Sequence, residues 1–170
     1  RQGQLPQQQI YLDSPMAIAV TEIYHRYQNV YNAEDAQTLH RGKSSSLHSF
    51  LPILRYSATT AESMALNRIE SGAIFIAGSG MCNGGRIRHH FKHNLWKANA
   101  HVIIVGFQAI GTPGRALVDG ERFFHIGGDE IAVRASIHTL GGFSAHASQS
   151  QLFDWLQNFR KPHPRLFLVH

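Results

Sequence analysis

The sequence predicts an α/β fold in which parallel strands alternate with flanking helices. Short continuous apolar runs recur along the chain, as expected for strands that are buried on both faces. Capping or glycine-rich residues follow most of these runs and precede segments of helical length. Hydrophobic residues make up 43% of the 170 residues, which is enough to form a core. Repeated strand, loop and helix units of this kind build a layered parallel sheet.

The N-terminal part begins with polar, Gln-rich residues 1–8, for which we expect no regular structure. A first strand is expected at 10–12. The following Ser14-Pro15 supplies an N-cap and a first-turn proline, which predicts a helix of about 13 residues ending near Asn29. Residues 30–50 lack clean periodicity, so we expect short helical pieces and loop there.

The middle of the chain repeats this pattern. A second strand is expected at 53–56, followed by a helix that Thr59 or Thr60 caps and that runs to about Arg68. The apolar run at 73–77 predicts a strand buried on both faces. These segments supply two of the expected strand and helix units.

A glycine-rich turn over 78–85 then leads into a basic helix that runs from Gly85 to about Trp96. The run at 101–105 predicts the next buried strand. A turn at 111–114 follows. These residues form the third strand, loop and helix unit and open the fourth.

The last third of the sequence has a different texture. Alternating segments at 116–125 and 131–139 predict antiparallel hairpins. A polar turn at 144–148 precedes an amphipathic helix at 149–159, and the apolar run 166–169 predicts a final strand. Because that strand reaches the last residue, we expect the chain to be cut from a longer protein.

Charge is distributed unevenly along the chain. The net charge is +5 with histidine neutral, yet the 48 residues from Ser71 to Val118 contain no Asp or Glu, where an even spread would place about three. The cations in this window are Arg86, Arg88, Lys92, Lys97 and Arg115. A polyanion is the simplest partner for such a surface. The alternative is that buried strands and glycine loops carry few acids for structural reasons.

The sequence disfavours two classes of protein, membrane-spanning proteins and secreted proteins. No apolar stretch approaches the roughly 18 residues of a membrane span, and no basic-then-apolar leader opens the chain. The single Cys82 cannot form an internal disulfide and favours a reducing compartment. We therefore expect a cytoplasmic protein with no membrane association.

The strongest local motif is the segment 77–86, Ala-Gly-Ser-Gly-Met-Cys-Asn-Gly-Gly-Arg. Four glycines between a strand and a basic helix allow close approach to a ligand and leave backbone N–H groups available for an anion. A dinucleotide fingerprint would need glycine at Asn83, and a Walker loop would need Lys and Ser or Thr where Arg86-Ile87 stands. We favour a phosphate-facing loop, although tight packing alone could explain the glycines.

The histidines have several alternative interpretations. His89 and His93 are four residues apart, as in a zinc-binding pair, but His90 stands where such a motif needs glutamate. We therefore favour phosphate contact over a free-standing zinc site, with surface or core histidines as the alternative. His146 lies in a polar turn before a helix, and His170 follows an apolar strand, a position that suits a metal ligand.

Taken together, segments in this order resemble the β-CASP branch of the metallo-β-lactamase superfamily, the zinc-dependent nucleases that process RNA. The resemblance covers nearly the whole chain and is closest to the compact bacterial RNA-metabolising members, related to the eukaryotic pre-mRNA 3′-end endonuclease. The matching segments are 12–17 (Leu-Asp-Ser-Pro-Met-Ala), 78–82, 84–87, 89–90, 105–109, 111–112, 114–115, 142–147 and 168–170.

The resemblance implies a β-CASP cap domain at 1–142, with parallel sheet and flanking helices, and a C-terminal return into the metallo-β-lactamase fold at 143–170. It implies that His146 is a catalytic residue that contacts the scissile phosphate and that His170 is a zinc ligand. Ser148 stands where the family usually has Asp, which puts the orientation of His146 in doubt. The motifs and the basic helix together give the expected RNA-contacting residues, which are Ser79, Gly80, Met81, Gly84, Gly85, Arg86, Arg88, His89, His90, Thr112, Arg115 and Ser144.

For the parent enzyme, the resemblance implies RNA phosphodiester hydrolysis with two zinc ions, single-stranded RNA as partner and a possible homodimer. The family's other metal ligands precede Arg1 in family order, so we expect this fragment neither to assemble the zinc site nor to cleave RNA. One alternative is a non-catalytic RNA-binding or scaffold member of the family. A nucleotide-binding α/β domain is disfavoured by the failed phosphate motifs.

Overall fold

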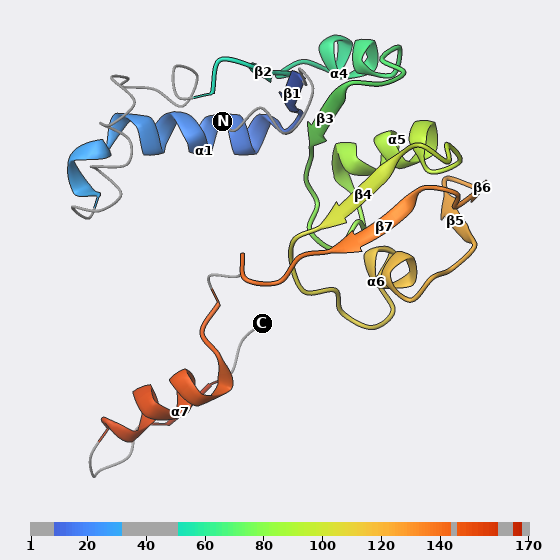
Figure 1. Ribbon diagram of the computed structural model, residues 1–170. Coiled ribbons are helices and arrows are strands. Elements are labelled where there is room, and N and C mark those ends of the chain that lie inside the picture. The colour runs from blue at the N-terminus through green and yellow to red at the C-terminus, as the bar shows by residue number, and fades with distance from the viewer. Residues whose placement is uncertain (1–8, 32–50, 144–145, 160–164, 168–170) are drawn as a thin grey trace.

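The computed structural model describes residues 9–31, 51–143, 146–159 and 165–167. The elements in chain order are β1 (Gln9–Leu12), α1 (Pro15–Arg26), the 3-10 helix η1 (Gln28–Val30), β2 (Leu54–Tyr56), α4 (Thr60–Leu66), β3 (Ala73–Ile76), α5 (Gly85–Asn94), β4 (His101–Ile104), α6 (Pro113–Val118), β5 (Phe123–Ile126), β6 (Asp129–Ala132), β7 (Ser136–Thr139) and α7 (Gln149–Gln157). This mixed α/β architecture, with parallel strands and flanking helices, confirms the predicted fold class (Figure 1).

The strands form two parallel sheets and one antiparallel hairpin. In the first sheet the order is β2-β1-β3, with Ile10 opposite Leu54 on one side and Ile74 on the other. In the second, β4 pairs with β7 in parallel, and β5 and β6 form the hairpin. Parallel pairing places the carboxyl ends of paired strands at the same edge, so the loops that follow them are neighbours.

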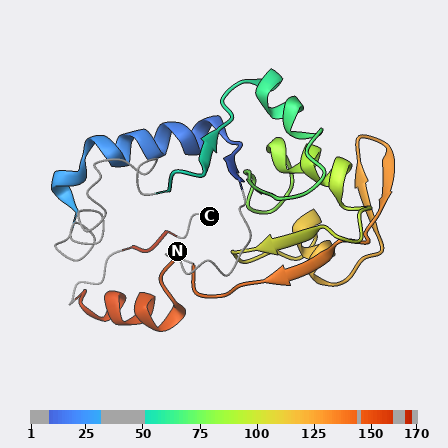
Figure 2. The same cartoon turned by 45° about the horizontal axis from the view of Figure 1, so that its top comes forward.

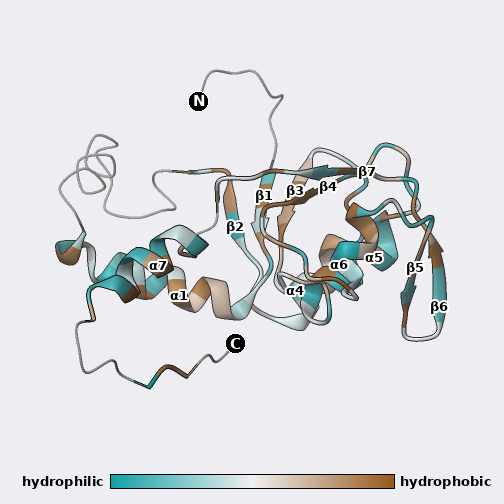
Figure 3. Ribbon diagram, turned by 90° about the horizontal axis from the view of Figure 1, so that it is seen from below, coloured by the Kyte–Doolittle hydropathy of each residue, from teal (hydrophilic) through white to brown (hydrophobic). Residues whose placement is uncertain are grey.

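Two apolar clusters hold these layers together. The larger buries seven side chains from α5, β4, α6, β5 and the adjoining loops, with Phe91 and Phe124 in edge-to-face contact. The smaller buries Leu12, Ile18 and Leu54, where α1 packs on the first sheet. Figure 3 shows α5 and α6 together on one side of β4 and β7, as a shared cluster requires. Helix α7 has no buried residue and stands apart from the sheets (Figures 1 and 2).

Local signals explain most helix starts. Ser14 caps α1 and Pro15 occupies its first turn, as expected. Thr59 caps α4 in a capping box with Glu62, in which each residue satisfies a backbone N–H near the other. Ser148 caps α7 in the same way with Gln151, so the serine at this position does support the helix start.

Three expectations for the C-terminal third were wrong. The hairpin expected over 116–125 is in part helical, because Thr112 caps α6 and Pro113 begins it. Within 131–139, β7 does not pair in a local hairpin but joins β4 in parallel. Residues 166–167 are not strand, and the remainder of that expected strand lies outside the described residues, as do the expected pieces over 32–50. Short apolar segments specify a strand but not its partner.

Candidate functional site

The candidate site is the glycine loop, residues 77–84, which follows β3 and precedes α5. Asp13 follows β1 and Ser57 follows β2, so both lie at the same sheet edge as this loop. Gln108 follows β4 and reaches the loop from the other side. The carboxyl edge of a parallel sheet is where α/β proteins commonly bind ligands.

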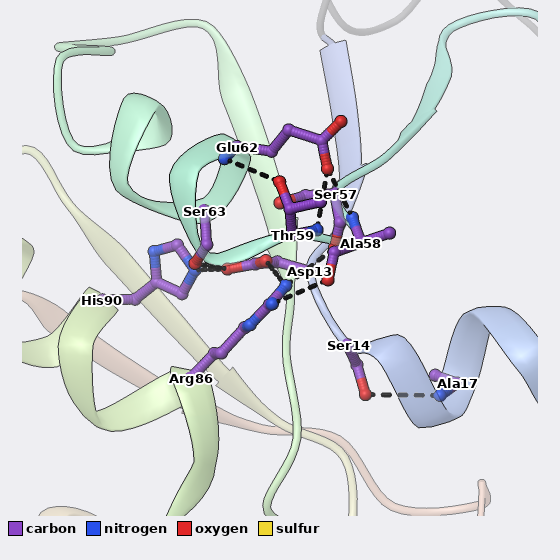
Figure 4. A network of polar contacts seen from close by, with 10 residues as sticks. All are labelled: Asp13, Ser14, Ala17, Ser57, Ala58, Thr59, Glu62, Ser63, Arg86 and His90. Atoms are coloured by element: carbon purple, nitrogen blue, oxygen red, sulfur yellow. Dashed lines mark hydrogen bonds and ion pairs between the residues drawn. The ribbon is translucent and has the colours of Figure 1, made fainter.

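Asp13 is the centre of a buried polar network on one side of the loop (Figure 4). Its side chain is 0% exposed and accepts hydrogen bonds of 2.7 Å from Ser63 Oγ, Arg86 Nη1 and His90 Nε2. Because an ionised carboxylate only accepts, the proton on His90 lies on Nε2. The network joins β1, α4 and α5 through one carboxylate.

Arg86 extends this network to the end of β2. Its guanidinium donates to the carbonyl oxygens of Ser57 (2.7 Å) and Ala58 (2.8 Å) as well as to Asp13. The carboxylate of Glu62 in turn accepts from the N–H groups of Ala58 and Thr59, at 2.9 and 2.8 Å. The first turn of α5 is therefore fixed to the segment that leads into α4 (Figure 4).

The pKa of Asp13 reflects two opposing effects. Burial alone would raise it, but hydrogen bonds from Ser63, His90 and Arg86 together hold the pKa of this carboxyl below its ordinary value. Asp13 is therefore ionised at neutral pH, and the Arg86 guanidinium is its matched counter-ion.

His90 is 5% exposed, and its ring stacks on Phe75 of β3 with centroids 4.8 Å apart and planes within 10°. Among the described residues, no partner contacts its Nδ1. This histidine therefore packs between the sheet and α5 instead of facing solvent. Its closest polar contact is structural, with Asp13.

Gln108 and Gly114 support the loop from its other side. The Gln108 amide, 6% exposed, donates to Gly80 O at 2.8 Å, and Gly114 N donates to Met81 O at 3.1 Å. A Cβ on Gly114 would lie 1.8 Å from Gln108 Oε1 and 3.2 Å from Cys82 Sγ, so α6 approaches this closely only because residue 114 is glycine. Burial raises the pKa of the Cys82 thiol, which makes it a packing residue.

Gly85 fixes the junction between loop and helix. Its φ of +70° is left-handed, and a Cβ there would lie 2.7 Å from Gly78 O. Ile87 N also donates to Gly78 O at 3.0 Å. The loop therefore closes back on its own start, which requires glycine at residue 85.

The tip of the loop keeps donors available. Within the described residues, the backbone N–H groups of Ser79, Gly80 and Met81 donate no hydrogen bond, and Gly80 is exposed. Successive N–H groups beside a helix N-terminus form an anion-binding concavity. The arrangement is chemically suited to bind a phosphate group.

The cations of the acid-free window are largely matched by acids from outside it. Arg86 pairs with Asp13, Lys92 with Asp129, and Arg115 Nε with Asp119 at 2.8 Å. In the described part of the chain no acid pairs with Arg88 or Lys97. Arg88 Nη1 donates instead to Asn83 O at 2.9 Å, directly beside the loop. The positive surface is thus narrower than the sequence window suggests.

The remaining expected site residues are dispersed or outside the described residues. His89 is exposed on α5, and Thr112 caps α6 by accepting from Arg115 N. His146 is exposed in the segment before α7. Ser144 and His170 lie outside the described residues. The structure therefore brings together residues 79–81, 84–86, Arg88 and His90. Their expected roles in RNA binding stay predictions.

Desolvation and the neighbouring cations lower the pKa of His93, which favours its neutral form. No group of three or more His, Cys, Asp or Glu side chains that could hold a metal ion occurs among the described residues, and this includes the face of α5 that carries His89 and His93.

Asp13, Ser63 and Gln108 are not among the site residues that the sequence predicts. A signal for Asp13 was present, since an acid placed between an apolar strand and a helix cap lies at the sheet edge. Gln108 follows β4 in the same way. No local signal marks Ser63, because its partner is 50 residues away in the sequence.

None of the described helices is long and apolar enough to cross a membrane.

Comparison with known families gives two matches. The family model for the Beta-Casp domain matches residues 1–117, and the model described as the Zn-dependent metallo-hydrolase RNA specificity domain matches residues 130–170. Together they bear out the family resemblance. The expected boundary at residue 142 stays a prediction.

Curated relatives point the same way. The chain is 41% identical to Ribonuclease TTHA0252 of Thermus thermophilus over 98% of its own length and 37% of the relative's. It is 34% identical to transcription termination factor FttA of Thermococcus kodakarensis and 26% identical to FttA of Methanocaldococcus jannaschii, over 95% of this chain in both cases and 25% and 26% of those proteins. The chain thus spans about a quarter to two fifths of the length of these relatives.

Proposed function

We propose, because this chain belongs to the β-CASP family of the metallo-β-lactamase superfamily, that it is the RNA-holding part of a zinc-dependent ribonuclease. The observation that carries the proposal is the glycine loop. Its tip leaves three successive backbone N–H groups available, while partly buried hydrogen bonds fix both of its sides. A preformed donor set lowers the entropic cost of binding a phosphate.

In this proposal the backbone N–H groups of Ser79, Gly80 and Met81 bind one phosphate of single-stranded RNA. Arg88 and His89, the other site residues on α5, add positive charge or hydrogen bonds nearby. Arg86 and His90 act indirectly, since their side chains are committed to Asp13 and hold α5 against the loop. Phosphate contacts of this kind bind RNA with little dependence on sequence.

Catalysis belongs to the intact protein. We propose that His146 protonates the departing oxygen when the phosphodiester breaks, because histidine is the side chain that most often serves as a general acid in enzymes. His170 is our proposed zinc ligand, and two zinc ions in the intact enzyme would supply the hydrolytic chemistry. The Zn-dependent hydrolase domain that matches residues 130–170 supports the choice of metal. A homodimer of the intact protein stays a prediction.

Binding is tested by fluorescence anisotropy of a labelled single-stranded RNA. With one phosphate contacted, affinity should fall about 3-fold between 50 and 200 mM salt. Gly80→Asp places a negative charge at the loop tip, where no atom lies within 4 Å of the new Cβ, and it should abolish most binding. The matched control is Ala98→Asp, which adds the same charge on the exposed turn that precedes β4. The residue that contacts the glycine loop, Gln108, follows the other end of β4.

Absence of RNA binding, or equal losses in the two variants, would contradict the proposal. The chain alone should not cleave RNA at stoichiometric zinc, and cleavage that a chelator abolishes would show that expectation to be wrong. In the intact protein, His146→Ala should lower cleavage while RNA affinity stays constant. If the protein is instead a non-catalytic scaffold, the intact wild-type protein should not cleave RNA.

A further inference from the structure

We propose that Phe107 is a stacking position for an RNA base beside the glycine loop. This inference rests on the proposed RNA binding and adds to it the part of the nucleotide that is recognised. Phe107 follows β4 and is 75% exposed, whereas the next residue, Gln108, is 6% exposed. One residue of this turn is thus anchored inside the protein and its neighbour presents an aromatic ring to solvent.

The ring is presented by a rigid support. The Gln108 amide donates both to Gly80 O, at 2.8 Å, and to Phe107 O, at 3.0 Å. Ala109 N lies 3.4 Å from Met81 Sδ, which adds a second link between the two loops. The backbone that carries Phe107 is therefore fixed to the loop tip that carries the available N–H groups.

The chemistry around the ring favours a nucleotide over an apolar protein surface. The loop tip offers backbone donors for a phosphate, and Arg88, without an acidic partner in the described residues, contacts the same loop at Asn83. Of the five Lys and Arg residues in the window 71–118, Arg88 and Lys97 are the two that no acid pairs with in the described part of the chain. A cationic, donor-rich surface beside an exposed aromatic ring is the combination by which proteins bind single-stranded nucleic acid.

A stacked base gives affinity with little dependence on sequence, because every base has a π-face. Phe107 would thus contribute what the phosphate-binding loop cannot, a preference for single-stranded nucleic acid over polyanions that carry no bases. Ile110, 88% exposed and three residues further along the same turn, offers an apolar edge for the same base. The intact phosphodiester chain would then enter the site with one base held flat and one phosphate held by the loop.

The test compares two ligands of equal charge, a ten-nucleotide oligo(A) RNA and an abasic oligomer of the same length. Phe107→Leu keeps an apolar side chain but removes the aromatic face, and it should weaken oligo(A) binding about 5- to 100-fold while abasic binding stays constant. Phe107→Trp should retain oligo(A) binding. Phe123→Leu, at a half-exposed phenylalanine of β5, is the matched control and should change neither.

The outcomes separate this inference from the function on which it rests. If the wild-type chain binds both oligomers equally and Phe107→Leu changes neither, the stacking role is wrong and phosphate binding stands. Equal losses of both ligands in Phe107→Leu, or a self-association that this variant abolishes, would also overturn it. Absence of binding to either oligomer would overturn the RNA-binding function itself, and the stacking role with it.

Discussion

The two halves of the molecule are held together by different means. Around β4, β7, α5 and α6, seven buried side chains form an apolar cluster. Around β1, β2 and α1, only three buried side chains form such a cluster, and the buried Asp13 carboxylate lies beside them. Helix α5 belongs to both halves, since Phe91 packs in the larger cluster and Arg86 and His90 reach Asp13. The glycine loop begins this helix and therefore lies where the apolar and the polar regions meet.

This difference has a consequence for specificity. Apolar packing is non-directional and tolerates small shifts, whereas a buried carboxylate with three donors accepts only one arrangement of its neighbours. Asp13 thus sets the position of α5, and with it the loop, more sharply than the small apolar cluster could.

The largest effect is expected for Asp13→Asn. The variant leaves the Arg86 guanidinium without its counter-ion in a site with little solvent, and breaking a buried pair costs about 3–5 kcal/mol. Urea unfolding measures the loss. Ser63→Ala removes one neutral donor of the same network and should cost about 1 kcal/mol. An Asp13→Asn loss no larger than that of Ser63→Ala would show that the network is not the main support of this half.

The second effect concerns the loop junction. Gly85→Ala must place a side chain at a φ of +70° and 2.7 Å from Gly78 O, so we expect a loss of about 2–3 kcal/mol from left-handed strain and overpacking. The preceding Gly84 is the matched control, since its φ is −156° and no atom lies within 4 Å of an added Cβ. Equal stabilities of the two alanine variants would show that the loop can close in another way.

The sequence identified the strands and helices better than their partners. The cap Thr112 and the first-turn Pro113 are signals for α6, but the neighbouring glycines and the alternating segment that follows predict a turn and a hairpin instead. The parallel pairing of β7 with β4 could not be predicted, because a four-residue strand with a single apolar residue, Ile137, carries no information about its neighbour. Burial patterns encode faces, and register depends on the assembled sheet.

The site was predictable in its location but not in its electrostatics. The glycines of the loop were identified from the sequence because strand, glycine turn and helix are consecutive. The matching of Arg86 by Asp13, and of Lys92 by Asp129, spans 73 and 37 residues, so an acid-free window in the sequence is not an acid-free surface. Exposed Phe107 was not singled out, because only the burial of Gln108 shows which way the turn faces.

The free energy of unfolding should also depend on pH through Asp13. This pH-dependent stabilisation is one part of the stabilisation that Asp13→Asn removes. Hydrogen bonds hold the pKa of Asp13 below its ordinary value of 3.8, so its stabilising contribution is present above pH 3.8 and is lost as the pH falls through the lower, folded-state value. The stability difference between wild type and Asp13→Asn should therefore narrow as the pH falls from 5 to below 3. A constant difference across that range would show that the charge of Asp13 makes no net contribution.

The smallest effect is expected at an ion pair in the apolar half. Lys92 of α5 pairs with Asp129 of β6, and about half of each side chain is exposed to solvent. Exposed pairs contribute roughly 0–1 kcal/mol, so Asp129→Asn should leave the unfolding free energy almost unchanged.

The same variant releases Lys92, a cation on the helix that carries Arg88, and should therefore raise RNA affinity. At 200 mM salt the gain in affinity should be smaller, because salt screens exposed charges. Asp154→Asn, which removes the same charge from the exposed helix α7, is the control for net charge. A stability loss near that of Asp13→Asn would contradict the contrast between the two halves, because α5 would then depend on its exposed ion pair as much as on its buried one.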